Sequence, residues 1–184
     1  MKYLFNLLLI ACLTFSGCSK SVSQAKKTAK KNESTVKKDD ENAIKWLSYD
    51  EAVKQNVKRP RKIFVDVYTD WCGWCKQLDK TSFRDPNVVN YVNKYYYAVK
   101  LNAESGAKVM YKGKEMTSAE LARNVFHATG YPTTVYLDQK ENLLQPVSGY
   151  LEADMLNKIL HYYGDDHYKT ISWDNFQIGY NNGQ

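Results

Sequence analysis

Cysteine and histidine are scarce in this chain, which has 184 residues but only 4 cysteines and 3 histidines. His127, His161 and His167 form no paired motif, and the cysteines form a single C-x-x-C pattern. Tetrahedral zinc takes about four ligands, so this supply argues against a dedicated zinc protein. The sequence also has no internal repeat, which argues against a repeat architecture.

Long apolar runs are missing apart from one at the amino terminus. The run spans Tyr3 to Phe15, is broken by Asn6 and follows a cationic start. It is too short to cross a bilayer comfortably and predicts a secretory signal. The next residues, Phe15-Ser16-Gly17-Cys18, resemble the lipobox of bacterial lipoproteins, although Phe15 stands where an aliphatic residue is usual. We expect a lipoprotein signal peptide at residues 1–17 and lipidation of Cys18; an ordinary signal peptide is the alternative.

Strong net charge is absent from the larger part of the chain. The formal charge is +6, of which Lys2 supplies +1 and residues 19–42 supply +3, leaving about +2 for residues 43–184. Nothing in this balance suggests a nucleic-acid partner. Residues 18–42 lack apolar periodicity and predict a lipid-anchored disordered tether, a solvated spacer whose lysines can also approach anionic lipid heads. The remaining stretch is long enough for one domain with a core.

The pattern of residues 43–184 predicts an α/β domain with a mixed central β-sheet flanked by helices on both faces. Ser48 and Glu51, and likewise Thr117 and Glu120, have the spacing of a capping box at a helix start. The expected strands are 63–68, 96–101, 133–137 and 143–148, the last two joined as a hairpin. The expected helices run from 48 to about 56, from near 72, from 85, from 117 to about 126, from 151 to 163 and, briefly, from 172.

Trp71-Cys72-Gly73-Trp74-Cys75-Lys76 is the motif with the clearest chemical meaning. Two thiols at this spacing can form a static disulfide, hold a metal or catalyse thiol–disulfide exchange. A C-x-x-C at a helix start closes a tight and reducible loop, which argues against a static clip. There Cys72 would also meet unpaired backbone donors that favour its thiolate, and Cys75, one turn further in, should be the shielded cysteine.

The sequence resembles the thioredoxin superfamily over residues 44–163. The strand and turn from Val65 to Lys76, the segment Gly130-Tyr131-Pro132-Thr133 and Gly149 after the last strand match that family in order. The W-C-G-W-C-K form is similar to envelope thioredoxin-like proteins, because cytosolic thioredoxin has proline where Trp74 stands. The resemblance therefore implies a thioredoxin-like fold whose catalyst is the cysteine pair itself, without a cofactor or a metal.

The resemblance also implies a role for each residue at the redox centre. Cys72 is the candidate nucleophile, and Cys75 resolves the mixed disulfide. Asp66 matches the buried acid that accepts a proton from the resolving thiol, and Lys100 matches the lysine beside that acid. The simpler alternatives are a satisfied polar group in the core for Asp66 and a strand-end lysine with a solvated head for Lys100.

Five further residues are candidates for binding a substrate peptide. Tyr131 and Pro132 fit a cis peptide bond in a turn that, by resemblance, faces the cysteines and offers backbone hydrogen bonds. Trp71 and Trp74, with Gly73 between the cysteines, would form an apolar rim. A trans proline and tryptophans that only pack locally are the alternatives.

Three segments depart from the family pattern. Residues 102–116 form an insertion, expected as a small hairpin or loop that either selects partners or is neutral. His127 stands where glycine is common, so we expect it to cap a helix in the left-handed conformation. The extension 164–184 is rich in aromatic residues, so we expect it to pack on the domain.

These features predict a thiol–disulfide oxidoreductase of the bacterial cell envelope. It would exchange electrons with cysteines of exported proteins or with a redox relay partner, as a monomer held to the membrane by lipid on Cys18 and facing the periplasm or exterior. Trp74 leaves the direction of exchange open. The alternatives are a metal-binding envelope lipoprotein that uses the cysteines as ligands and a redox-inert binding module.

Overall fold

The structure is a computed structural model that describes residues 42–183. The expectations for residues 1–41, including the signal peptide, the tether and lipidation of Cys18, lie outside the described residues. Within the described part of the chain, no helix combines the length and the apolar character needed to cross a membrane.

The described residues form two sheets, six α-helices and three further helical segments of other types. The strands are β1 (Trp46–Leu47), β2 (Lys62–Tyr68), β3 (Tyr96–Asn102), β4 (Lys108–Tyr111), β5 (Lys114–Thr117), β6 (Thr133–Leu137) and β7 (Leu143–Ser148). The helices are α1 (Tyr49–Lys58), α2 (Gly73–Lys80), α3 (Pro86–Tyr95), α4 (Ser118–Glu120), α5 (Ala153–Gly164) and α6 (Trp173–Gly183). The short segments are η1 (Ser82–Arg84), η2 (Leu121–Val125) and η3 (His167–Lys169).

The central sheet has five strands in the order β1-β3-β2-β6-β7. Strand β3 pairs in parallel with both β1 and β2, whereas β6 pairs antiparallel with both β2 and β7. The mixed sheet predicted from the sequence is therefore confirmed. Its central strand, β2, is buried along nearly its whole length, as its continuous apolar run predicts.

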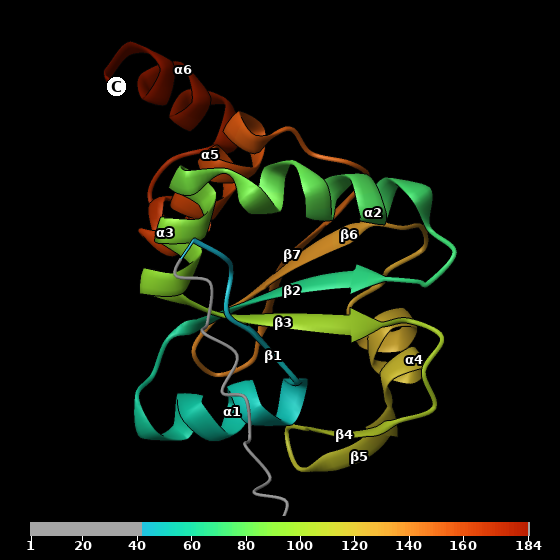
Figure 1. The fold of residues 1–184 in the computed structure, drawn as a ribbon. Helices are drawn as coiled ribbons and strands as arrows, with labels where there is room; N and C mark the ends of the chain where they lie inside the picture. Colours follow the sequence, from blue (N-terminus) through green and yellow to red (C-terminus); the bar gives the residue numbers. More distant parts are fainter. Residues whose placement is uncertain (1–41, 184) are drawn as a thin grey trace, which may run out of the picture. The chain divides into compact units, whose positions relative to one another are not determined.

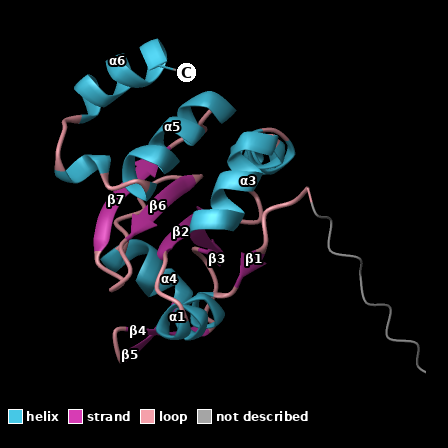
Figure 2. Cartoon of the chain, turned by 90° about the vertical axis from the view of Figure 1, so that its left-hand side faces the viewer, coloured by secondary structure: helices cyan, strands magenta, loops and turns pink. Residues whose placement is uncertain are grey.

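Helices cover both faces of this sheet, and alternate residues of β2 point to opposite faces. Ile63, Val65 and Val67 pack in the core that contains side chains of α1 and η2. Phe64 packs in the other core, with side chains of α2, α3 and α5. Figure 1 shows these two helical layers above and below the strands, and Figure 2 shows them from the side. Asp66 lies two residues after Phe64 and therefore on the same face of β2, so it faces the helical layer that contains α2.

The sequence missed one strand, β1, and predicted a four-stranded sheet. This prediction was wrong because β1 has only two residues, too few for any alternation, and is defined by backbone pairing of Trp46 and Leu47 with Ala98 and Val99. Both capping boxes are present, one at Ser48 and one at Thr117. They satisfy backbone donors that a helix start otherwise leaves unpaired.

The structure describes the three departures from the family pattern up to residue 183. The insertion forms the hairpin β4–β5, which extends one residue further, to Thr117; its turn at Lys112 and Gly113 has positive φ angles of 47° and 78°. His127 has φ 55°, which confirms the left-handed conformation predicted for it. The C-terminal extension packs on the domain, because Phe176 of α6 is 5% exposed and its ring lies 5.1 Å from that of Tyr162.

Candidate active site

The two cysteines of the motif form a disulfide at the start of α2. Cys72 is the N-cap residue of the helix, and the backbone N–H of Cys75 donates to its Sγ over 3.0 Å. The Cα atoms of the pair lie 5.3 Å apart. A turn in which the Cys72 N–H donates to the Thr69 carbonyl, over 3.2 Å, connects the motif to β2. The helix start therefore supplies a donor to the sulfur of the expected nucleophile.

Burial does not distinguish the two cysteines, contrary to the expectation that Cys75 alone is shielded. Cys72 is 4% exposed and Cys75 is 3% exposed. Each sulfur covers part of the other in the disulfide, which lowers the exposure of both. The asymmetry lies instead in hydrogen bonding, since the backbone donor points at Cys72.

The proline turn lies beside the motif. The Tyr131–Pro132 peptide bond is cis, as the sequence predicted. The Tyr131 ring stands edge-on to the Trp71 ring, with centroids 6.1 Å apart. The Gly149 N–H donates to the Pro132 carbonyl over 2.8 Å and so ties the turn to the end of β7. Residues 60 positions apart in the sequence thus form one surface.

Asp66 and Lys100 form an ion pair beneath α2. They are register partners on β2 and β3, and the Lys100 Nζ lies 2.6 Å from the Asp66 Oδ2. Asp66 is 1% exposed, and its Oδ1 is buried without a hydrogen-bond partner among the described residues. Burial raises the pKa of the Asp66 carboxyl to about 6, although Lys100 acts to lower it. An unpaired oxygen on an acid of this pKa is suited to accept a proton near neutral pH.

A third charged group, Asp79, belongs to this cluster and was missed from the sequence. Its carboxylate also bonds the Lys100 ammonium. It stands four residues after Cys75, one turn along the same face of α2, and this spacing is the only signal the sequence offered. Burial lowers the pKa of Lys100, but the carboxylates of Asp66 and Asp79 outweigh that effect and raise it. Two carboxylates therefore share one firmly charged ammonium.

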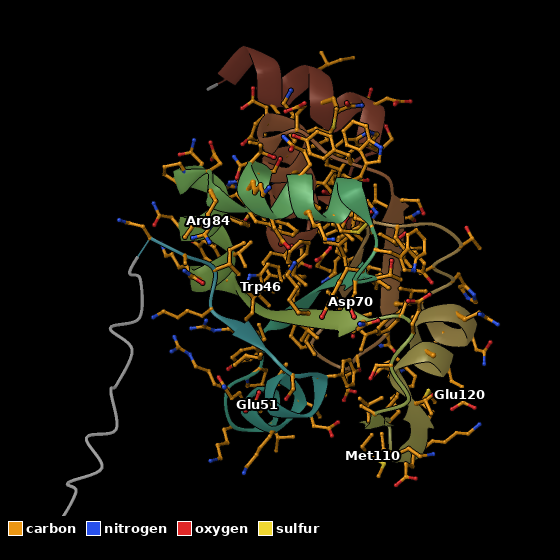
Figure 3. The ribbon with its side chains drawn as sticks, turned by 45° about the vertical axis from the view of Figure 1, so that its right-hand side comes forward. Trp46, Glu51, Asp70, Arg84, Met110 and Glu120 are labelled. Carbon is orange, nitrogen blue, oxygen red and sulfur yellow. A yellow bond between two sulfur atoms is a disulfide. The ribbon has the colours of Figure 1, made fainter. Side chains whose placement is uncertain are left out.

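Three aromatic rings lie close to the Lys100 ammonium. It lies 4.8 Å from the ring centroid of Trp46, 5.3 Å from that of Tyr68 and 5.1 Å from that of Phe83. Trp46 comes from the short strand β1 and is labelled in Figure 3. These contacts, together with the two carboxylates, hold the ammonium in place, and the Lys100 side chain is 22% exposed.

Two exposed tryptophans flank the disulfide. Trp71 is 67% exposed and Trp74 is 63% exposed. The Trp71 Nε1–H donates to Glu104 over 3.0 Å, and the Trp74 ring lies 5.5 Å from the ring of Tyr150. Neither Glu104 nor Tyr150 carried a signal in the sequence, since both lie far from the motif along the chain. The tryptophans leave an accessible apolar surface on each side of the cysteines.

Within residues 42–183 there is no group of three or more histidine, cysteine, aspartate or glutamate side chains arranged to hold a metal ion.

Known proteins resemble this chain in sequence. The profile of the thioredoxin-like domain family matches residues 49–164. A relative named thiol:disulfide interchange protein DsbD, from Haemophilus influenzae strain 86-028NP, is 31% identical over 111 residues, which cover 57% of this chain and 17% of the relative. The protein of the same name from Pectobacterium atrosepticum is 31% identical over 100 residues, covering 53% and 16%. The matched segment is thus about a sixth of the length of these relatives.

Solved structures share the fold. The solution structure titled a putative disulphide-isomerase from Bacteroides thetaiotaomicron has a TM-score of 0.54 and 28% identity, covering 71% of this chain and 95% of that one. A thioredoxin-fold protein from Helicobacter pylori has a TM-score of 0.56 and 17% identity, covering 76% and 87%, and supports the fold alone.

Proposed function

The chain belongs to the thioredoxin-like domain family, and from that premise we propose that it is a protein thiol–disulfide oxidoreductase. The observation that carries the proposal is the Cys72–Cys75 disulfide at the start of α2, with a backbone donor directed at the Cys72 sulfur. A helix N-terminus and an aimed N–H favour the thiolate, which is the reactive form of cysteine. The interchange proteins related to this chain by sequence support the same chemistry.

The proposed exchange has two steps. In the first, the Cys72 thiolate of the reduced protein attacks one sulfur of a substrate disulfide; the substrate S–S bond breaks, and the other substrate sulfur leaves as a thiolate. In the second, the Cys75 thiolate attacks the Cys72 sulfur, the mixed disulfide breaks, and the second substrate thiolate leaves. Two electrons pass from the cysteine pair to the substrate. A redox partner that carries a dithiol restores the pair by the same steps in reverse.

Asp66 is the proposed acceptor of the Cys75 proton. It lies on the face of β2 that is turned toward α2, and its Oδ1 has no hydrogen-bond partner among the described residues. With a pKa of about 6, it is largely ionised at pH 7 and can take a proton directly or through water. Lys100 is a positioning residue, because it holds the carboxyl through Oδ2 and stabilises its charge.

The substrate is proposed to bind as an extended segment across Tyr131 and Pro132, with Trp71, Gly73 and Trp74 around its cysteine. The turn at Tyr131 lies against Trp71, so a bound backbone would pass directly over the motif.

We also propose that the protein acts in the bacterial envelope as a monomer, anchored by lipid on Cys18. The lipobox-like sequence before Cys18 supports the anchor. A Cys18→Ser chain should move from the membrane fraction to the soluble fraction and lose the labelled acyl chains. Sedimentation of the residues that follow the tether should give the mass of one chain.

The activity is tested with purified protein and the disulfides of insulin. The reduced wild-type protein should cleave them with turnover when a chemical dithiol is present. Cys72→Ser should abolish the reaction, whereas Cys75→Ser should stop after one mixed disulfide. Asp66→Asn should slow release of that mixed disulfide more than its formation. An inactive but folded wild-type protein would instead favour the redox-inert binding module.

The direction of electron transfer between the protein and its substrates is determined by a redox titration against glutathione. A potential near about −270 mV, that of thioredoxin, would assign the protein to substrate reduction, and one near about −120 mV would assign it to oxidation.

A further inference from the structure

An open hollow of about 550 Å³ is lined in part by Gly73 and Trp74, the two residues between the cysteines. Each of these two residues adjoins a cysteine in the chain, so a side chain bound in the hollow would come from a residue close to the reacting cysteine of the substrate. The hollow is lined by Gly73, Trp74, Gln77, Tyr150 and Glu152. These residues come from α2 and from the connection between β7 and α5, which are separate in the sequence.

The aromatic walls of the hollow are Trp74 and Tyr150. Their rings are tilted at 43° with centroids 5.5 Å apart. The Tyr150 hydroxyl is within 3.0 Å of the Thr81 hydroxyl, which fixes the ring against the end of α2. Trp74 is 63% exposed, so much of its surface is open to a ligand. A planar cation can stack on such a surface.

One wall is an acidic group without a counter-ion. Glu152 is exposed, and its carboxylate accepts a hydrogen bond of 3.3 Å from the Tyr150 hydroxyl. It forms no ion pair among the described residues. It is the N-cap residue of α5, yet its side chain makes no capping hydrogen bond. The carboxylate therefore makes neither a capping bond nor an ion pair within the described residues and is available to a ligand. No basic side chain lines the hollow.

We propose that this hollow is a specificity site that binds a basic side chain of the protein substrate, arginine in preference to lysine, within a few residues of the reacting cysteine. The inference rests on the proposed exchange function and names its substrate class. Arginine combines a planar face for Trp74 with a fork of donors for the Glu152 carboxylate, whereas lysine offers only a point charge. Both contacts are partly solvated, so the preference is moderate.

The test uses six-residue peptides with one cysteine, each joined as a disulfide to uncharged 2-mercaptoethanol. Arginine, lysine, glutamine or leucine stands two residues before or two residues after the cysteine. The second-order rate constant for reaction with the reduced protein is measured by chromatography of the released peptide thiol. Each rate is divided by that of the glutamine peptide for the same variant, which cancels any change in the reactivity of Cys72.

The wild-type protein should prefer the arginine peptide by about fivefold at one of the two positions, and the lysine peptide by about twofold. The arginine preference should shrink in about 0.5 M salt, because exposed charges are screened. Glu152→Gln should reduce it to within about twofold of unity. Glu104→Gln removes an acid on the Trp71 side of the motif and is the matched control, which should keep the preference.

Several results would overturn the inference while exchange itself remains intact. These are equal rates for arginine and glutamine peptides, a leucine peptide as fast as the arginine peptide, an unchanged preference in Glu152→Gln, and an equal loss in Glu104→Gln. Failure of every peptide to react, glutamine included, would instead refute the proposed function and this inference with it.

Discussion

Replacing Asp66 by asparagine should change the free energy of unfolding of the oxidised protein, relative to wild type, more favourably at neutral pH than at acidic pH. Burial raises the pKa of this carboxyl from 3.8 to about 6 in the folded state, although the Lys100 ammonium acts to lower it. The folded protein therefore binds more protons than the unfolded chain between about pH 4 and pH 6. Its free energy of unfolding falls as the pH rises through this window, since the carboxyl must ionise in a buried site.

The size of the effect follows from the shift. About two pKa units correspond to about 3 kcal/mol, and Asp66 is fully buried, so solvent screening removes little of this. Asparagine keeps the shape of the side chain but does not titrate. The difference in unfolding free energy, variant minus wild type, should thus rise by about 2–2.5 kcal/mol from about pH 4 to pH 7, since part of the shift lies outside this range. The variant also loses the ion pair with Lys100, which changes the unfolding free energy by a constant amount. The prediction therefore concerns only the part of the difference that varies with pH.

The assay is urea unfolding of both proteins with the disulfide intact, at constant ionic strength from about pH 4 to pH 8. Asp79→Asn is the companion variant: it keeps Asp66 but removes the second carboxylate on Lys100, so the window should move to lower pH. A difference between Asp66→Asn and wild type that stays constant over this range would refute the reasoning, because the carboxyl would then titrate alike in folded and unfolded chains.

Two further predictions concern stability. Asp166→Asn should lower the unfolding free energy by about 1–3 kcal/mol in urea titrations. The variant leaves the buried Lys62 ammonium, which lies 2.9 Å from this carboxylate, without its counter-ion. No loss of stability would show that the Gly164 carbonyl alone satisfies Lys62. Gly164→Ala should lower the unfolding free energy by about 1–3 kcal/mol, since its Cβ would lie 2.3 Å from the Tyr91 hydroxyl. Gly106→Ala, with open space around the new Cβ, should change the unfolding free energy by less than about 0.5 kcal/mol. Equal effects of the two variants would contradict the packing at Gly164.

Features encoded by neighbouring residues could be predicted from the sequence. The capping boxes at Ser48 and Thr117 use hydrogen bonds within four residues, so their spacing is sufficient evidence. The continuous apolar run around Asp66 likewise predicts that this acid lies in a buried strand, as β2 shows. The left-handed His127 and the cis peptide bond before Pro132 were instead predicted from the resemblance to the thioredoxin superfamily.

Features that depend on distant segments could not be predicted. Strand β1 is too short to show a pattern and exists through pairing with β3. Asp79 joins the Asp66–Lys100 pair because α2 crosses the sheet at a particular height, which the spacing of side chains along the helix does not fix. Tyr150 meets Trp74 across 76 positions of sequence, through the return of the chain at the end of β7.

The most direct measurement is a trapping experiment with the Cys75→Ser protein in cells. Without the resolving thiol, Cys72 should remain joined to its substrates, and mass spectrometry should identify peptides disulfide-linked to Cys72. The chain that also carries Cys72→Ser is the control and should trap nothing. If the folded Cys75→Ser protein is present and no partner is linked to Cys72, the proposed exchange through this cysteine pair is contradicted.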